Sequence, residues 1–113
     1  MQHAYADFLG DPRRYLELPA FYQAKRDRFL ELIRGSRFRP LPCRGTYYQM
    51  LGYAAISNEP ELAFARRLTV DHGVAAIPPS VFYHERDDHQ VLRFCFAKRD
   101  ETLIAAAERL CAI

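Results

Sequence analysis

The sequence VLRFCFAKRDETLIAAAERLC, residues 91–111, predicts a strand that runs directly into a helix. Residues 91–96 are rich in the aliphatic and aromatic side chains that strands favour. Asp100 can cap a helix, and apolar residues after it recur at the spacing of one helical face. These apolar residues are Leu103, Ile104, Ala107, Leu110 and Cys111. We therefore expect a strand over 91–96 and a helix that packs across the sheet through this stripe.

Arg93 is the charged residue within that predicted strand. A guanidinium is costly to bury unless an anion pairs with it. Two interpretations follow from the residues. Either an Asp or Glu of the chain forms an internal ion pair with Arg93, or a ligand supplies the anion.

Length and composition indicate one folded domain. The chain has 113 residues, 50% of them hydrophobic and 13% aromatic, which is enough for a real core. Sixteen Lys and Arg against fourteen Asp and Glu leave a net charge of +2, which is not the pattern of a nucleic-acid-binding protein. The basic cluster over 34–39 is interpreted as a solvated helix end.

Cysteine usage and hydropathy predict a soluble, cytoplasmic protein without a membrane partner. Cys43, Cys95 and Cys111 are odd in number and widely spaced, as expected for reduced thiols. The N-terminus lacks the layout of a signal peptide, and no apolar run approaches the ~20 residues of a membrane span.

Working outward from residues 91–111, the other elements follow from apolar periodicity and from Pro and Gly positions. They are a helix over 19–33 after one or two turns at 11–18, strands over 38–41 and 45–53, a helix from Ser57 or Asn58 to Gly73, a strand over 74–77 and a loop over 80–90. The buried face of the second long helix is predicted to be Leu62, Ala65, Leu68 and His72. The order α-β-β-α-β-β-α suits an α/β two-layer sandwich, with a small, mainly antiparallel sheet and helices on one face.

The loop over 80–90 contains possible metal ligands. His84 and His89 lie near Glu85, Asp87 and Asp88, and imidazole and carboxylate groups both bind metals. Their spacing matches no metal motif, so we interpret the loop as a solvated surface and predict no metal site. No nucleophile motif, phosphate-binding glycine loop or zinc-binding H-E-x-x-H occurs, so no catalytic residue is predicted.

Three ordered segments, taken together, resemble a known family. They are GTYYQMLGYAAIS (45–57), HGVAAIPPSVFY (72–83) and LRFCFAKRDETLIAAAERL (92–110). They resemble the C-terminal small domain of pyridoxal-phosphate-dependent aminotransferases of fold type I, and are most similar to the methionine and the kynurenine or glutamine aminotransferase branch. YLELPAFYQAKRDRFLELI (15–33) also resembles the long helix that leads into that domain. The resemblance covers nearly the whole chain.

The resemblance implies a role for two residues. Arg93 occupies the position whose guanidinium binds the α-carboxylate of amino-acid and 2-oxo-acid substrates in the family. Gly45 occupies the position of a glycine that lies beside the substrate. Residues 77–83 resemble a loop that closes near the mouth of the active site, although Pro79 stands where many relatives have glycine.

The resemblance also implies what this chain lacks. The family's cofactor lysine, the aspartate on the pyridine nitrogen and the phosphate-binding groups belong to an N-terminal large domain. Lys25 and Lys98 are the lysines here, and neither has the context of the cofactor lysine.

We therefore expect residues 1–113 to be the small domain alone, without the large domain. Such a chain would be inactive and bind no pyridoxal phosphate, whereas the parent enzyme would use that cofactor and have a homodimer partner. The alternative is a free-standing α/β binding or interaction module that has lost the catalytic domain.

Overall fold

A three-stranded antiparallel sheet in the order β1-β2-β3 forms the centre of the computed structural model, which describes all 113 residues. The strands are β1 (Arg39–Pro40), β2 (Tyr48–Gly52) and β3 (Val91–Cys95). Leu51 lies opposite Leu92, and Met50 lies opposite Arg93. Because side chains alternate across a strand, Leu51 and Leu92 lie on one face and Met50 and Arg93 on the other.

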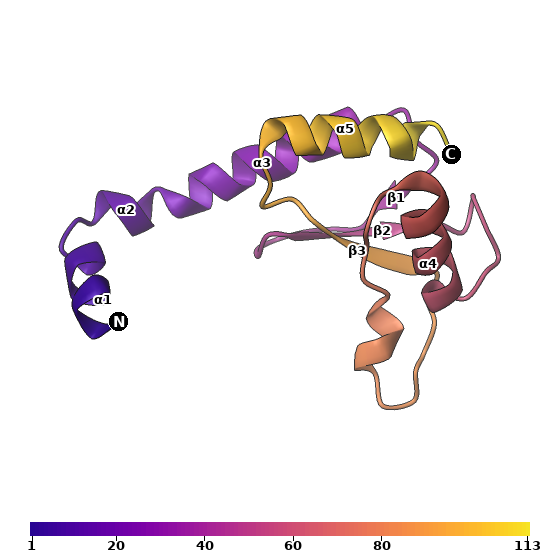
Figure 1. Cartoon of the computed structure of the whole chain (residues 1–113), viewed down its shortest axis with the longest axis horizontal. Helices are drawn as coiled ribbons and strands as arrows, with labels where there is room; N and C mark the ends of the chain where they lie inside the picture. The colour runs from indigo at the N-terminus through magenta and orange to yellow at the C-terminus, as the bar shows by residue number, and fades with distance from the viewer.

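Helices cover the Leu51 and Leu92 face of the sheet. They are α3 (Leu18–Leu32), α4 (Glu61–His72) and α5 (Asp100–Cys111). The helices α1 (Gln2–Leu9) and α2 (Arg13–Leu16) precede α3, and a 3-10 helix η1 (Pro79–Phe82) precedes β3. α5 lies along the second half of α3, and α4 packs at the far end of the sheet (Figure 1). No helix combines the length and the apolar composition that crossing a bilayer requires.

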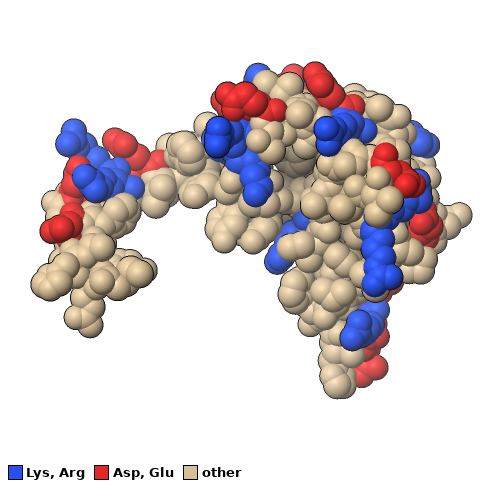
Figure 2. All heavy atoms as spheres, viewed as in Figure 1, with Lys and Arg blue, Asp and Glu red and all other residues tan.

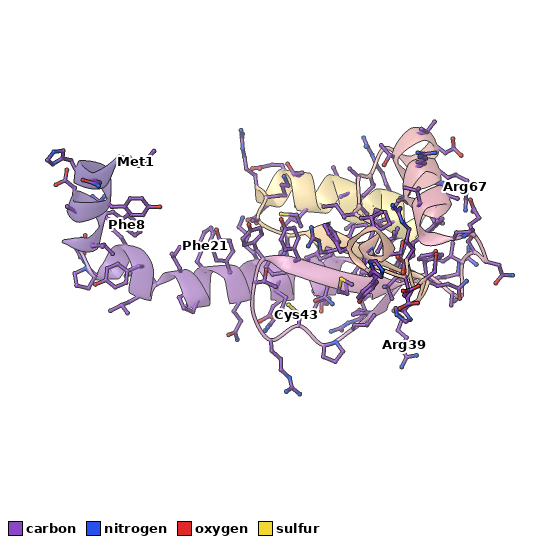
Figure 3. The ribbon with its side chains drawn as sticks, turned by 90° about the horizontal axis from the view of Figure 1, so that it is seen from below. Met1, Phe8, Phe21, Arg39, Cys43 and Arg67 are labelled. Carbon is purple, nitrogen blue, oxygen red and sulfur yellow. The ribbon has the colours of Figure 1, made fainter.

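The chain divides into an arm, residues 1–21, and a body, residues 22–113. The arm consists of α1, α2 and the first turn of α3, and it extends away from the body (Figure 1). In Figure 3, Phe8 and Phe21 lie along this arm, while Cys43, Arg39 and Arg67 lie on the body. All buried residues belong to the body.

The core joins the sheet to α3, α4 and α5. Leu51, Leu92 and Leu110 are fully inaccessible, and the rings of Tyr53 and Phe64 lie 4.3 Å apart between centroids. Burying one such side chain stabilises the fold by about 1.5–3 kcal/mol. This face of the sheet is therefore fixed by hydrophobic packing.

The predicted fold class is confirmed, with a small antiparallel sheet and helices on one face. The strand predicted over 74–77 is reduced to a single bridge between Ile77 and Arg93. Two backbone hydrogen bonds join these residues, at 2.9 and 3.0 Å. The segment cannot extend further as a strand because Pro78 and Pro79 have no N–H to donate, and η1 begins there instead.

Side-chain burial in the two later helices only partly follows the predicted stripes. In α5, Leu103, Ala107 and Leu110 are buried as predicted, whereas Cys111 is exposed.

In α4, Ala65 and Leu68 are buried as predicted, but Leu62 is exposed and Phe64 occupies the core position. The helix is therefore rotated so that residues 64, 65 and 68 face the core. Gly73 ends α4 with a left-handed φ of 68°, as its position predicted.

Candidate functional site

Arg93 lies on the sheet face opposite the core, in the middle of β3. Its Cζ atom is 4.1 Å from the ring centroid of Tyr48 and 5.1 Å from that of Phe82. Tyr48 comes from the neighbouring strand β2 and Phe82 from η1. A guanidinium so close to two aromatic rings gains cation–π attraction and loses freedom to rotate. The two rings therefore hold the guanidinium in a defined place.

No carboxylate of the chain pairs with Arg93. The ion pairs of the structure join other residues, and the buried Nε atom of Arg93 has no hydrogen-bond acceptor. A buried donor without an acceptor normally costs about 1–3 kcal/mol. The internal ion pair considered from the sequence is not formed.

Arg93 borders a largely apolar cavity of about 380 Å³. Tyr48 and Lys98 line it, together with residues 73–77 and the side of α5 that faces them. A mostly apolar cavity with a few polar groups is the usual form of a small-molecule site. The arrangement suits a small molecule with one anionic end and an apolar remainder.

The phenol of Tyr48 stays protonated beside Arg93. Hydrogen bonding with the side chain of Tyr47, followed by desolvation, raises the pKa of Tyr48 above its ordinary value of 10.0, while the charge of Arg93 acts in the opposite direction. Tyr48 therefore presents a neutral ring and an O–H group at neutral pH.

Gly45 lies outside the Arg93 cavity. It borders a second cavity, of about 470 Å³, between α3 and residues 43–47, where Tyr22 and Arg26 are among the lining residues. A Cβ atom built on Gly45 would meet nothing within 4 Å. Packing within this chain therefore does not require glycine at this position. The structure does not bring Gly45 and Arg93 into one cavity.

Two acidic residues, Glu61 and Asp88, fasten the loop before β3, a role that the sequence did not predict for either of them. The fully buried carboxylate of Glu61 accepts backbone N–H bonds from Ser80 at 2.8 Å, His89 at 3.0 Å and Val91 at 3.2 Å. Asp88 in turn accepts the N–H of Glu61 at 2.7 Å and so caps α4. Ser57 and Asn58, the predicted caps, do not cap α4. Asp88 of the distant loop does so instead.

The loop residues considered as metal ligands form no metal site. No group of three or more His, Cys, Asp or Glu side chains is placed to hold an ion. His84 is exposed and lies 3.7 Å from Glu85, and Asp88 is engaged at the start of α4. All five of these side chains are exposed, so the loop lies on the surface.

The two lysines of the chain do not form a cofactor site. Nζ of Lys25 donates to Asp100 at 2.9 Å, and this hydrogen bond lowers the pKa of Asp100 below its ordinary value. Lys98 is exposed after β3. Lys98 borders the Arg93 cavity, whose lining residues include no Asp or Glu that could pair with a pyridine nitrogen, so the residues present do not fit pyridoxal phosphate.

Charges of both signs lie side by side on the face of the molecule that Figure 2 shows. On the face shown in Figure 2, acidic side chains lie among the lysine and arginine side chains on both the arm and the body. A nucleic-acid-binding surface normally gathers basic residues on one face.

Comparisons of the sequence and of the structure with known proteins both find aminotransferases. No family model matches the chain. Methionine aminotransferase of Escherichia coli is 48% identical over 110 residues, which cover 96% of this chain and 28% of that protein. Kynurenine–oxoglutarate transaminase 1 of Mus musculus is 31% identical over 118 residues, covering 91% of this chain and 28% of that protein.

The solved structures that resemble this chain are also aminotransferases. An E. coli protein described as having a methionine aminotransferase function matches with a TM-score of 0.93 and 47% identity, over 97% of this chain and 29% of its own. N-succinyldiaminopimelate aminotransferase from Mycobacterium tuberculosis matches with a TM-score of 0.74 and 31% identity, over 84% and 25%.

Over the region compared, sequence and structure both indicate a fold-type I aminotransferase domain. The similarity is to the methionine and kynurenine branch of these enzymes. The chain spans a little over a quarter of the length of the curated relatives it matches, 28% for both proteins above.

Proposed function

We propose that this chain is the C-terminal small domain of a pyridoxal-phosphate-dependent aminotransferase, and that Arg93 binds the α-carboxylate of amino-acid and 2-oxo-acid substrates. The observation that carries this assignment is the Arg93 guanidinium on the open sheet face, without an acidic partner and beside Tyr48 and Phe82.

The chemistry of the guanidinium supports the assignment. Arginine presents N–H groups in a planar fork that matches both oxygens of a carboxylate. Tyr48 and Phe82 limit the rotation of that fork, so less side-chain entropy is lost when a substrate binds. The apolar lining of the cavity beside Arg93 reduces competition from water.

Gly45 is proposed to lie beside the substrate in the complete enzyme. The space around its Cα is open within this chain, which would let a ligand or another domain approach the backbone closely. Because Gly45 and Arg93 border different cavities, contact of both with one substrate requires further surfaces of the enzyme.

The remaining chemistry is assigned to other parts of the enzyme. Pyridoxal phosphate, when bound, acts as the electron sink for amino-group transfer. Lys25 is engaged by Asp100 and Lys98 is exposed, so this chain alone is proposed to be inactive. A large domain and a homodimer partner would supply the cofactor site.

A cytoplasmic location is part of the proposal. It is supported by the three cysteines, Cys43, Cys95 and Cys111, which are free thiols in the structure. Reduced thiols persist in the cytoplasm, whereas oxidising compartments favour disulfides.

A chimera tests the proposed function. This chain would replace the matching region of E. coli methionine aminotransferase, and the Arg93→Lys variant would be compared with the unchanged chimera. A point-charge ammonium cannot make two parallel hydrogen bonds, and losing one charged bond costs about 1.5–3 kcal/mol, so kcat/KM should fall roughly tenfold to a hundredfold. KM for the amino acid should rise.

Arg99→Lys is the matched control, because Arg99 is exposed just after β3 and forms none of the ion pairs of the structure. Its kinetics should not change. A folded chimera that does not transaminate, or unchanged kinetics in Arg93→Lys, would contradict the assignment and favour a free-standing binding module.

A further inference from the structure

We propose that Glu61 is a positioning residue for the carboxylate site, because its side chain holds both the start of the strand that carries Arg93 and the turn that carries Phe82. This role depends on the proposed function of Arg93. Glu61 lies at the start of α4, on a different element from Arg93, Tyr48 and Phe82.

The two oxygens of Glu61 hold two different segments. Oε2 accepts the N–H of Ser80, which belongs to η1 and lies two residues before Phe82. Oε1 accepts the N–H groups of His89 and Val91. Val91 begins β3 two residues before Arg93. One buried carboxylate thus joins the start of the arginine strand to the turn that carries Phe82.

Glu61 also continues the hydrogen bonding at the outer edge of β3. Arg93 exchanges two backbone hydrogen bonds with Ile77 at this edge. The next residues after Ile77 are Pro78 and Pro79, which begin the turn into η1 and cannot extend the pairing. Since the chain turns into η1 there, the N–H of Val91 has no backbone acceptor in the structure, and the Glu61 carboxylate accepts it at 3.2 Å.

The position of Glu61 is itself held from the loop. Asp88 accepts the N–H of Glu61 at 2.7 Å with one oxygen and the N–H of Gln90 at 3.0 Å with the other. The Glu61 carboxylate of α4 therefore binds the backbone of the loop, and the Asp88 carboxylate of the loop binds the backbone of α4. Since a carboxylate is an acceptor at both oxygens, the three N–H donors around Glu61 satisfy it without a cation.

This network lies outside the hydrophobic core. Neither η1 nor the loop over 83–90 contributes to the buried apolar cluster of α3, α4, α5 and the sheet. Loosening the network should therefore displace Phe82 and the start of β3 without emptying a core site. The consequence should appear in substrate-carboxylate binding more than in the integrity of the fold.

The Glu61→Gln variant of the same chimera tests this role. The amide retains the size of the side chain, but its NH₂ group must face at least one backbone N–H, so one hydrogen bond becomes a contact between two donors. We expect KM for the amino acid to rise roughly tenfold, with kcat within about a factor of three, because carboxylate binding is weakened uniformly. Peptides that contain Ser80 and Val91 should exchange amide hydrogen roughly tenfold faster.

Two further variants separate positioning from general damage. Glu59→Gln removes the same charge two residues earlier, where Glu59 forms a half-exposed pair with Arg67 at 2.7 Å, and it should change neither KM nor exchange. Glu61→Asp keeps both acceptors but is one methylene shorter, so it should give a smaller rise in KM. It also decides the question if Glu61→Gln does not fold.

A double-mutant cycle with Arg93→Lys identifies the path of the effect. If Glu61 acts through Arg93, its substitution should change kcat/KM much less in the Arg93→Lys background. Additive losses, or unchanged KM and exchange in both Glu61 variants, would overturn the positioning role while the Arg93→Lys result alone still supports the carboxylate site. Unchanged kinetics in Arg93→Lys would instead overturn the proposed function, and exchange at Ser80 and Val91 would then report only on the loop.

Discussion

The body and the arm of this chain both carry apolar side chains on helices, but only the body buries them. In the body, Phe29 of α3 and Leu110 of α5 are almost inaccessible. In the arm, Tyr5 is 64% exposed and Leu16 is 70% exposed, and neither α1 nor α2 has a buried residue. The arm helices are held by local backbone hydrogen bonds, whereas the body is held by burial.

The difference teaches what an apolar pattern does and does not determine. Helical spacing indicates that a segment has one apolar face, and both regions have such faces. Whether another surface of the same chain covers that face depends on tertiary contacts that spacing does not describe. α3 belongs to both regions, since its first turn is in the arm and its second half packs beside α5.

The largest expected effect is a contrast in amide hydrogen exchange between the two regions. Helices of eight and four residues are marginal without tertiary contacts, so amides of α1 and α2 should exchange at least about a thousandfold faster than those of Leu51 and Leu92. Exchange of the 113-residue chain followed by mass spectrometry or NMR measures this ratio. Equal protection in α2 and β2 would remove the distinction between arm and body.

Substituting one leucine in each region should give the next largest difference. Leu110→Ala should lower the free energy of unfolding by about 2–5 kcal/mol, because it leaves a cavity in the core. Leu16→Ala should change it by less than about 0.5 kcal/mol, because Leu16 is exposed on α2. Denaturant unfolding of both variants checks the pair. Comparable losses would mean that the arm is packed in solution.

Features of the body that depend on local sequence were predictable. The strand around Arg93, the end of α4 at Gly73 and the burial of Leu103, Ala107 and Leu110 follow from spacing and from glycine conformation. Each depends on residues within a few positions of one another.

Features that depend on distant partners were not predictable. Glu61 bonds to Ser80 and Val91, which are 19 and 30 residues away, and a glutamate at the start of a helix normally has a simpler role. The residues alone also did not determine on which face of the sheet Arg93 lies. Val91 and Leu92 point to opposite sides of β3, yet both are apolar and buried, so neither face stands out. Tyr48 and Phe82 meet Arg93 only through strand register and the η1 turn.

A smaller effect is expected at the end of α4, within the body. Gly73 has a φ of 68°, and a Cβ atom there would lie 2.6 Å from Nη1 of Arg109. Gly73→Ala should therefore lower the free energy of unfolding by about 1–2 kcal/mol, the usual cost of a left-handed residue with a side chain. Gly35→Ala is the control, since its Cβ would meet nothing within 4 Å and its φ is not positive. If both substitutions have the same effect, conformation at Gly73 is not the cause.

The smallest effect concerns the ion pair close to where α3 leaves the body. Nζ of Lys25 lies 2.9 Å from Asp100 at the start of α5, and the Asp100 side chain is 62% exposed, so solvent screens the attraction. Because Lys25 lowers the pKa of Asp100 below 3.8, the pair stabilises the chain at neutral pH, and this contribution is lost as the pH falls through the lowered pKa. The stability difference between the wild-type chain and Asp100→Asn should therefore be greatest near neutral pH and shrink in acid.

Glu101→Gln removes a charge from the same turn of α5 without touching Lys25, so subtracting its effect leaves the contribution of the pair. A difference that persists unchanged in acid would mean that Asp100 acts through the helix end and not through Lys25, and the contact between α3 and α5 would then depend on burial alone.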